Sequence, residues 1–297
     1  MYLLSHDRLP PITSIHALSV MIGINPGIVW SFVYRTHKHY RSFNIPKGKS
    51  SRTISAPRIG LKIIQKWLSF HLARVFLVPQ HVYGFVPGKS HLEAAYVHNQ
   101  AEWALSVDIR DFFPSTPASS IIQAFSSLGY SVEASCLLSA LTCFKGFLAQ
   151  GAPTSPVLSN ICFRTLDNDL LAIASRHSCV LSRYADDITF SGQGRFPEAL
   201  RHELRQLFAQ SVWRLADDKE RLQPMKGRIK IHGLLVKDGQ VRLTKGYRNK
   251  VRAYDHILST RGSGVVDAAF LKGHVSYARH VTKQIRALSF SVDKAET

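Results

Sequence analysis

The sequence predicts an α+β fold, in which an antiparallel sheet carries the candidate site and helices pack against it. Residues 103–110 alternate between apolar and polar, which is the period of a half-buried strand. Two apolar runs within 180–190 flank a tight A-D-D centre, which indicates a hairpin. Apolar residues recur at helical spacing over 61–78 and 158–173, which predicts two core-facing helices.

Composition and length favour a globular protein. The 297 residues are 45% hydrophobic and 20% charged, enough for one large domain or two with a sizeable core. No apolar run reaches the roughly 18 residues of a membrane span, and the first residues lack a secretory pattern. The four cysteines form no C-x-x-C pair, so we expect reduced thiols and a cytoplasmic location.

The charge balance points to a polyanionic partner. Lysine and arginine number 38 against 20 acidic residues, a net charge of +18. Nucleic acid is the first expectation and an anionic membrane surface the second, but no basic amphipathic anchor helix is apparent. The fourteen histidines contain no H-E-x-x-H, which argues against a zinc site.

The N-terminal third predicts helices, a basic hairpin and a long helix. Residues 1–40 suggest helical and irregular structure, with a break at Pro26-Gly27. Over 40–57, two β-type runs enclose a turn with Lys47, Lys49 and Arg52 on or beside it. Such a hairpin suits a triphosphate, whose charge the cations would neutralise, although a solvated basic loop explains the pattern too. The stripe Ile63, Ile64, Trp67, Leu68 and Leu72 then predicts a helix over 61–78.

The G-x-x-x-G-K-S stretch that ends at Ser90 is one residue too short for a Walker loop, so an ATPase is not predicted.

The next strand, over 103–109, puts Asp108 on the face opposite its apolar residues, and Pro114 should end it. A carboxylate there can join others around a metal or simply cap the strand end. In the loop over 150–156, Ser155 suits an N-cap and Pro156 a first helical turn.

The hairpin over 181–192 places Asp186 and Asp187 next to each other at its tip. A bend can aim both carboxylates into one small volume, where a metal ion would relieve their repulsion. The alternative is an ordinary Asp-Asp turn.

Beyond the hairpin we predict a helix over 198–215, a short strand over 231–236 that ends before an Asp-Gly turn, and a returning strand over 241–243. Residues 245–286 are basic, helical and interleaved with Tyr247, Tyr254 and Tyr277, which suits a nucleic-acid backbone and unpaired bases.

These motifs, in this order, resemble those of reverse transcriptases: the basic hairpin, Y-G-F with K-S, V-D-I-R-D-F-F, Q-G-A-P-T-S-P, Y-A-D-D and L-L-V. The resemblance implies a right-hand polymerase with an antiparallel palm sheet. Fingers would span 1–100 and the palm 101–235, with a helical fingers insertion near 117–148, and a short thumb would span 236–297.

The resemblance also implies a role for each candidate residue. Asp108, Asp186 and Asp187 would be the catalytic metal ligands, holding two Mg²⁺ ions. At the incoming nucleotide, Arg52 and Lys49 would lie on the hairpin, and Phe113 would be an aromatic gate against a ribose 2′-OH. Gln150 and Gly151 would lie beside the template. Lys219 would lie near the pyrophosphate. For Lys219 a solvated lysine in a charge run is an equal alternative. Residues at the nucleic acid would be Tyr184, Gly233 in the primer-gripping motif, and Arg248, Lys250 and Arg252.

The implied activity is RNA-directed DNA synthesis from dNTPs on a structured RNA template and primer, with an RNA–DNA hybrid as product. Within the family, the chain looks most like a retron or related bacterial defence enzyme. Such an enzyme would make msDNA and have a defence effector protein as a partner. A membrane is not expected among its partners. It departs from the retron pattern at two places. N-A-x-x-H reads A-A-Y-V-H up to His98, and V-T-G reads Ile231-His232-Gly233. Another defence or intron-derived reverse transcriptase, and a non-catalytic RNA-binding protein with a polymerase fold, are the alternatives.

Overall fold

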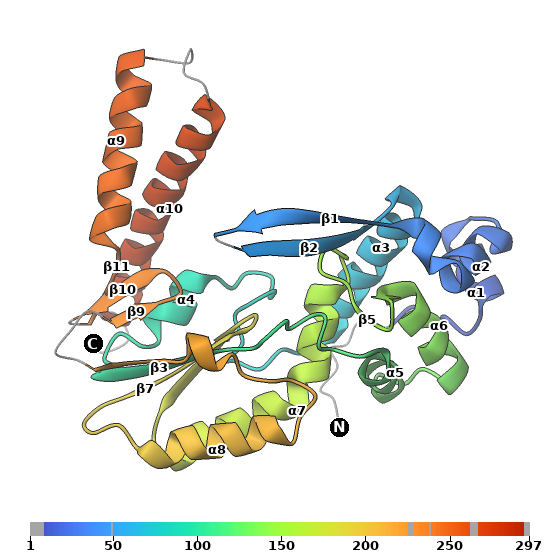
Figure 1. Ribbon diagram of the computed structural model, residues 1–297, viewed down its shortest axis with the longest axis horizontal. Helices are drawn as coiled ribbons and strands as arrows, with labels where there is room; N and C mark the ends of the chain where they lie inside the picture. Colours follow the sequence, from blue (N-terminus) through green and yellow to red (C-terminus); the bar gives the residue numbers. More distant parts are fainter. Residues whose placement is uncertain (1–8, 49, 225–228, 238, 262–266, 294–297) are drawn as a thin grey trace.

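The computed structural model describes residues 9–48, 50–224, 229–237, 239–261 and 267–293 (Figure 1). It mixes helices with antiparallel sheets, so the predicted α+β class is confirmed. Helices and a long hairpin form the N-terminal part, a four-stranded sheet lies in the centre, and two long helices near the C-terminus stand away from the body. Within the described ranges, no helix combines the length and apolarity needed to cross a membrane.

Two helices open the described chain, α1 (Ile15–Ile22) and α2 (Pro26–Tyr34). The Ser14 hydroxyl caps α1 by accepting from the Ala17 N–H at 3.1 Å, and Gly23 ends it at φ 70°. The expected break at Pro26-Gly27 is wrong by a few residues, because Pro26 starts α2 instead. Proline suits a first helical position, where no intrahelical N–H bond is needed.

The predicted basic hairpin exists as β1 (Tyr40–Lys47) and β2 (Ser50–Pro57), which pair from Tyr40↔Pro57 to Lys47↔Ser50. It projects from the body toward the C-terminal helices (Figure 1). Next comes α3 (Ile59–Val75), which buries Leu61, Ile64, Leu68 and Leu72 as expected. Ile63 is an exception to the predicted stripe: its side chain is 58% exposed.

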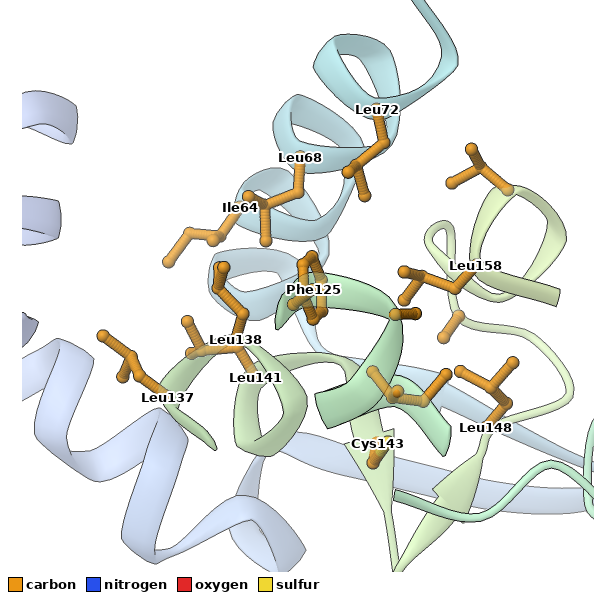
Figure 2. Close-up of a cluster of buried hydrophobic side chains, with 14 of the residues drawn as sticks. Ile64, Leu68, Leu72, Phe125, Leu137, Leu138, Leu141, Cys143, Leu148 and Leu158 are labelled. Atoms are coloured by element: carbon orange, nitrogen blue, oxygen red, sulfur yellow. The ribbon is translucent and has the colours of Figure 1, made fainter. Parts of the chain in front are cut away.

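The first core joins α3 to three elements far along the chain (Figure 2). These are α5 (Ala118–Ser127), α6 (Val132–Thr142) and the start of α7 (Ser155–Arg176). Phe125, Leu138 and Leu158 are fully buried against α3 residues such as Leu68. A small hairpin, β4 (Cys143–Phe144) with β5 (Phe147–Leu148), closes this core.

The central sheet has the order β6–β7–β3–β8, and every neighbouring pair is antiparallel. Its strands are β3 (Trp103–Asp108), β6 (Val180–Tyr184), β7 (Asp187–Gly192) and β8 (Arg221–Pro224). Strand β3 ends at Asp108, six residues earlier than the predicted stop at Pro114. The chain turns at once, with Asp111 at φ 46°.

Two helices, α7 and α8 (Glu198–Ala209), cover one face of this sheet (Figure 1). Leu170 of α7 and Phe208 of α8 pack with Leu105 and Phe190 of the sheet in the second core. The predicted N-cap at Ser155 is wrong, since Thr154 is the cap and the Ser155 hydroxyl donates to the Ala149 carbonyl at 2.7 Å. The predicted helix over 198–215 ends early, because Leu215 forms a β-bridge with Ile109.

A third, smaller core carries the C-terminal part. The sheet β9 (Ile229–Ile231), β10 (Leu234–Lys237) and β11 (Gln240–Leu243) packs with α4 (His91–Tyr96), and α10 (Ala268–Asp293) joins the same core. The predicted strand over 231–236 is broken by a His232-Gly233 turn, whose positive φ angles of 47° and 84° reverse the chain. The predicted return is confirmed, and α9 (Lys245–Arg261) and α10 lie side by side (Figure 1).

Gly84 tests how closely the loop before α4 packs on the central sheet. A Cβ at Gly84 would lie 2.1 Å from the Ala185 nitrogen, so Gly84→Ala must displace backbone. We expect a loss of about 2–3 kcal/mol in the free energy of unfolding, measured by urea denaturation. Gly273→Ala is the matched control: with open space around it in α10, it should stabilise by up to about 1 kcal/mol. Equal effects of the two would show that the Gly84 contact is loose.

Candidate active site

The tip of the β6–β7 hairpin is a two-residue turn, Ala185-Asp186, between paired Tyr184 and Asp187. Ala185 lies at φ 60°, a left-handed conformation that a non-glycine residue adopts only when its surroundings enforce it. The Asp186 carbonyl accepts a hydrogen bond from the Ile109 N–H at 2.9 Å, which ties the turn to the end of β3. The pairing sets Asp108 directly opposite Asp187. The three predicted carboxylates therefore meet at one end of the central sheet.

Each carboxylate has a different environment. Burial and the nearby Asp108 charge raise the pKa of Asp186 above its ordinary value, partly offset by Lys219. Asp108 is bonded to the Lys219 ammonium at 2.5 Å, and the Asp187 Oδ2 lies 3.0 Å from the His232 Nδ1. Burial is the larger cause of this shift, and the charge of Asp108 adds to it.

This donor set has the right chemistry for a divalent cation, because carboxylate oxygens are ligands that Mg²⁺ prefers. Among the residues that the structure describes, however, no group of three or more His, Cys, Asp or Glu side chains could hold a metal ion as it stands. Two of the three carboxylates are instead bonded to Lys219 and His232. A cation would have to compete with Lys219 for the Asp108 Oδ1, whereas His232 contacts the Oδ2 of Asp187 and leaves the other oxygen of that carboxylate to a cation.

A cavity of about 670 Å³ opens beside Asp186. Its wall brings together five of the predicted residues from five separate segments: Arg52 of β2, Phe113 after β3, Gln150 before α7, Asp186 at the hairpin tip, and Lys219 in the short 3₁₀ helix Asp217–Lys219. Such a mixture of cations, an amide and an aromatic ring suits a nucleotide. Sequence reasoning missed Phe85, which also lines this cavity. It is held at φ 62° with its ring 5.7 Å from that of Phe113.

Gly151 and Lys49 are the remaining candidates at the nucleotide. Lys49 lies outside the described residues. Gly151 has φ 122°, and a Cβ there would meet the Ile54 Cγ2 at 2.8 Å. The neighbouring Gln150 carbonyl accepts from the Ser55 N–H at 2.8 Å. Glycine at 151 thus lets the loop before α7 approach β2, while its predicted place beside the template stays a prediction.

The candidates for nucleic-acid contact are spread over two regions. Tyr184 is half-buried with its ring 5.6 Å from that of His232, and Gly233 completes the β9–β10 turn. On α9, Arg248, Lys250 and Arg252 are all exposed.

The three tyrosines expected to stack on bases differ in exposure. Tyr247 bonds to His274 at 2.8 Å and Tyr254 packs on Phe270, so neither is a free stacking surface. Tyr277 is 39% exposed, and its hydroxyl lies 2.8 Å from the His91 Nε2. Of the three, Tyr277 therefore offers the most ring surface to a base.

A buried arginine that sequence reasoning missed holds the turn between β6 and β7. Arg183, in the middle of β6, is fully buried and forms a two-pronged ion pair with Asp167 of α7, at 2.7 and 2.6 Å. The guanidinium also donates to the Asn160 side chain and to the Ala185 carbonyl, both at 3.1 Å. Burial alone would raise the pKa of Asp167, but Arg183 holds it below its ordinary value. Arg183 thus favours the charged form of Asp167 and anchors the left-handed turn to α7.

The same network reaches the loop before α4. The Arg183 N–H donates to the His81 carbonyl, and the Tyr83 N–H donates to the Arg183 carbonyl, both at 2.8 Å. The Asn160 amide donates to the Gly84 carbonyl at 3.0 Å. Three segments distant in sequence therefore share one buried hydrogen-bond network beneath the β6–β7 turn.

Comparison with known proteins gives consistent matches. A family model described as reverse transcriptase (RNA-dependent DNA polymerase) matches residues 45–229. The retron Ec86 reverse transcriptase of Escherichia coli is 28% identical, over 97% of this chain and 91% of its own. The retron Mx162 reverse transcriptase of Myxococcus xanthus is 31% identical, over 77% of this chain and 54% of its own. Among solved structures, telomerase from Candida albicans in complex with a TWJ fragment of telomeric RNA superposes with a TM-score of 0.48 at 10% identity, covering 90% of this chain and 59% of that one.

Removing the arginine tests the buried network. Arg183→Met leaves the buried Asp167 carboxylate without its guanidinium partner and with only the His81 ring nearby, at 3.5 Å, so we expect a loss of about 3–5 kcal/mol in the free energy of unfolding. Arg183→Met combined with Asp167→Leu removes both charges and should recover part of that loss, measured by urea denaturation. A double variant less stable than the single one would contradict this account of the pair.

Proposed function

We propose a function from the premise that this chain belongs to the reverse transcriptase family, as a bacterial retron-type member. It extends a primer on an RNA template by two-metal nucleotidyl transfer. The product is msDNA, made in antiviral defence. Membership makes the chain an RNA-directed DNA polymerase. The observation that carries the finer proposal is the meeting of Asp108, Asp186 and Asp187 beside the cavity. Phosphoryl transfer depends on positioning and charge neutralisation, which is what this arrangement offers.

Asp108, Asp186 and Asp187 would hold the two Mg²⁺ ions. When bound, such ions neutralise phosphate charge and lower the pKa of an attacking hydroxyl. In this proposal Lys219 exchanges its contact with Asp108 for the leaving pyrophosphate, since its ammonium already faces the cavity. Arg52 faces the same cavity from β2, where it can pair with the triphosphate.

The other cavity residues would select and orient the dNTP. Phe113 is only partly buried and packs on both Phe85 and Phe112, which hold its ring in place. A fixed ring at the cavity wall is the proposed gate against a ribose 2′-OH. Gln150 and Gly151 would lie along the template, and Lys49 would assist Arg52 from the hairpin.

For the RNA template and the RNA–DNA hybrid, we propose a thumb over 236–297, with the exposed Arg248, Lys250 and Arg252 of α9 on the phosphates. Fingers over 1–100 and a palm over 101–235, with a fingers insertion near 117–148, complete the hand. The insertion corresponds to α5 and α6, which share their core with α3. The primer end would lie near Tyr184 and Gly233. A defence effector protein as partner, and the cytoplasm as location, are part of this proposal, and the four free cysteines suit a reducing compartment.

A second basic surface supports RNA binding. Between Asp7 and Glu93 the chain contains twelve Lys and Arg residues and no acidic residue. Within it, Trp30 and Tyr34 are exposed and adjacent on α2, and the Arg35 guanidinium lies 5.2 Å from the centre of the Trp30 ring. Positive charge beside exposed aromatic rings suits single-stranded RNA. The N-terminal part would therefore share the binding of RNA with the thumb.

The catalytic carboxylates can be tested by removing charge alone. Asp186→Asn together with Asp187→Asn should abolish Mg²⁺-dependent DNA synthesis on a primed RNA template. RNA affinity should change little, because binding rests on the dispersed basic surface. The measurements are primer extension and filter binding. Asp169→Asn, which removes the charge of an exposed carboxylate on α7, is the control and should retain activity. Retained synthesis in the first variant would place the chemistry elsewhere.

Phe113→Ala tests the gate. Removal of the ring opens the cavity wall, so we expect the ratio of rNTP to dNTP incorporation efficiency to rise. The same change at Phe85, the neighbouring ring, is the comparison and should alter the ratio less. An unchanged ratio in Phe113→Ala would mean that another side chain excludes the 2′-OH.

A further inference from the structure

The turn between β9 and β10 carries an unusual side chain. His232 lies at φ 47°, and its imidazole is almost completely buried, with 3% of the side chain exposed. A non-glycine residue in this conformation is uncommon and indicates that its side chain is held by a specific contact. That contact is with the catalytic hairpin: the His232 Nδ1 lies 3.0 Å from the Asp187 Oδ2.

A chain of hydrogen-bonding groups supports His232 from behind. The His232 Nε2 faces the Ser182 hydroxyl at 3.5 Å, the longest link. That hydroxyl lies 2.7 Å from the His98 Nε2, and the His98 Nδ1 lies 2.6 Å from the Ser191 hydroxyl. His98, Ser182 and Ser191 are all at most 1% exposed. The imidazole of His98 therefore bridges β6 and β7, the two strands of the catalytic hairpin.

The directions of these bonds are consistent with one another. A carboxylate can only accept, so the His232 Nδ1 carries the proton and donates to Asp187. The His232 Nε2 then accepts from the Ser182 hydroxyl, which accepts from the His98 Nε2–H. The His98 Nδ1 accepts from Ser191. Burial lowers the pKa of His98 to about 3, so this ring is neutral and can donate at one nitrogen and accept at the other.

We infer that His232 is a positioning residue that fixes the orientation of the Asp187 carboxylate, and that Ser182, His98 and Ser191 hold His232 in place. This inference rests on the proposed function, in which Asp187 is catalytic. It couples the β9–β10 turn, the proposed primer grip, directly to a reacting group. His232 also stands where the V-T-G pattern has Thr.

The deciding variant is His232→Gly, because glycine keeps the positive φ and removes only the imidazole. A misoriented carboxylate affects the transition state more than dNTP binding. We therefore expect kcat for incorporation on a primed RNA template to fall by about tenfold or more, with KM for dNTP within about twofold. RNA affinity and melting temperature should stay close to the original. His232→Asn should restore part of kcat, since Asn tolerates this conformation and its amide can donate to Asp187.

The chain offers a matched control turn. Lys145-Gly146 joins β4 to β5 with φ angles of 53° and 83°, almost the same as in His232-Gly233. Lys145→Gly should leave kcat unchanged. A spectroscopic readout in the metal-free protein is the ¹⁵N signal of His232, which should report a proton on Nδ1 and shift in Asp187→Ala.

Unchanged kcat in His232→Gly, or a change in KM alone, would overturn the inference, as would a ¹⁵N signal that Asp187→Ala does not move. A failure of the proposed function looks different: the unaltered protein would make no DNA, while the His232 signal would still depend on Asp187.

Discussion

The geometry of the turn between β6 and β7, which carries Asp186, depends on one buried guanidinium. Arg183 neutralises Asp167, satisfies Asn160 and holds the Ala185 carbonyl, so a left-handed residue and a buried charge are stabilised by the same group. A buried ion pair gains little over an apolar core in stability alone, because desolvation offsets most of the attraction. Its contribution here is to position other segments. The hairpin, α7 and the loop before α4 are all joined through this one residue, and its planar guanidinium donates hydrogen bonds in fixed directions.

The pairing register of the strands that carry the carboxylates is set by the central sheet and not by the arginine. The pairing of β3 with β7 sets Asp108 across from Asp187, and a shift by one residue would send every second side chain to the opposite face. Lys219, Arg52 and Gln150 reach the cavity from segments that need only end at this edge of the sheet. In the proposed site, rigid strands thus carry the carboxylates that require precision, and loops and a hairpin carry the groups that would meet a mobile substrate.

Much of the fold could be predicted because its signals are local. Alternation at 103–108, the A-D-D turn and the stripe of α3 each need only a few neighbouring residues. The errors arose where distant partners decide the outcome: Ile63 is exposed because none of the described elements covers it, and β3 stops at Asp108 because Ile109 bonds to the hairpin. Arg183 and His232 were missed for the same reason, since their partners Asp167 and Asp187 lie far away in sequence. Two signals were available, a charged residue between the apolar positions of a strand and a His-Gly pair inside a presumed one.

The acid-free stretch between Asp7 and Glu93 has a consequence for the state of the protein without RNA. Its cations cannot be offset by carboxylates of the same segment, so small anions from solution must gather around the N-terminal part. When RNA arrives, these anions and the cations condensed on the RNA are both returned to bulk water, and the gain in their freedom drives assembly. For this chain the RNA is therefore a counter-charge as well as a template. The cations of the enzyme neutralise phosphate charge on the RNA, and the RNA neutralises the positive charge of the enzyme.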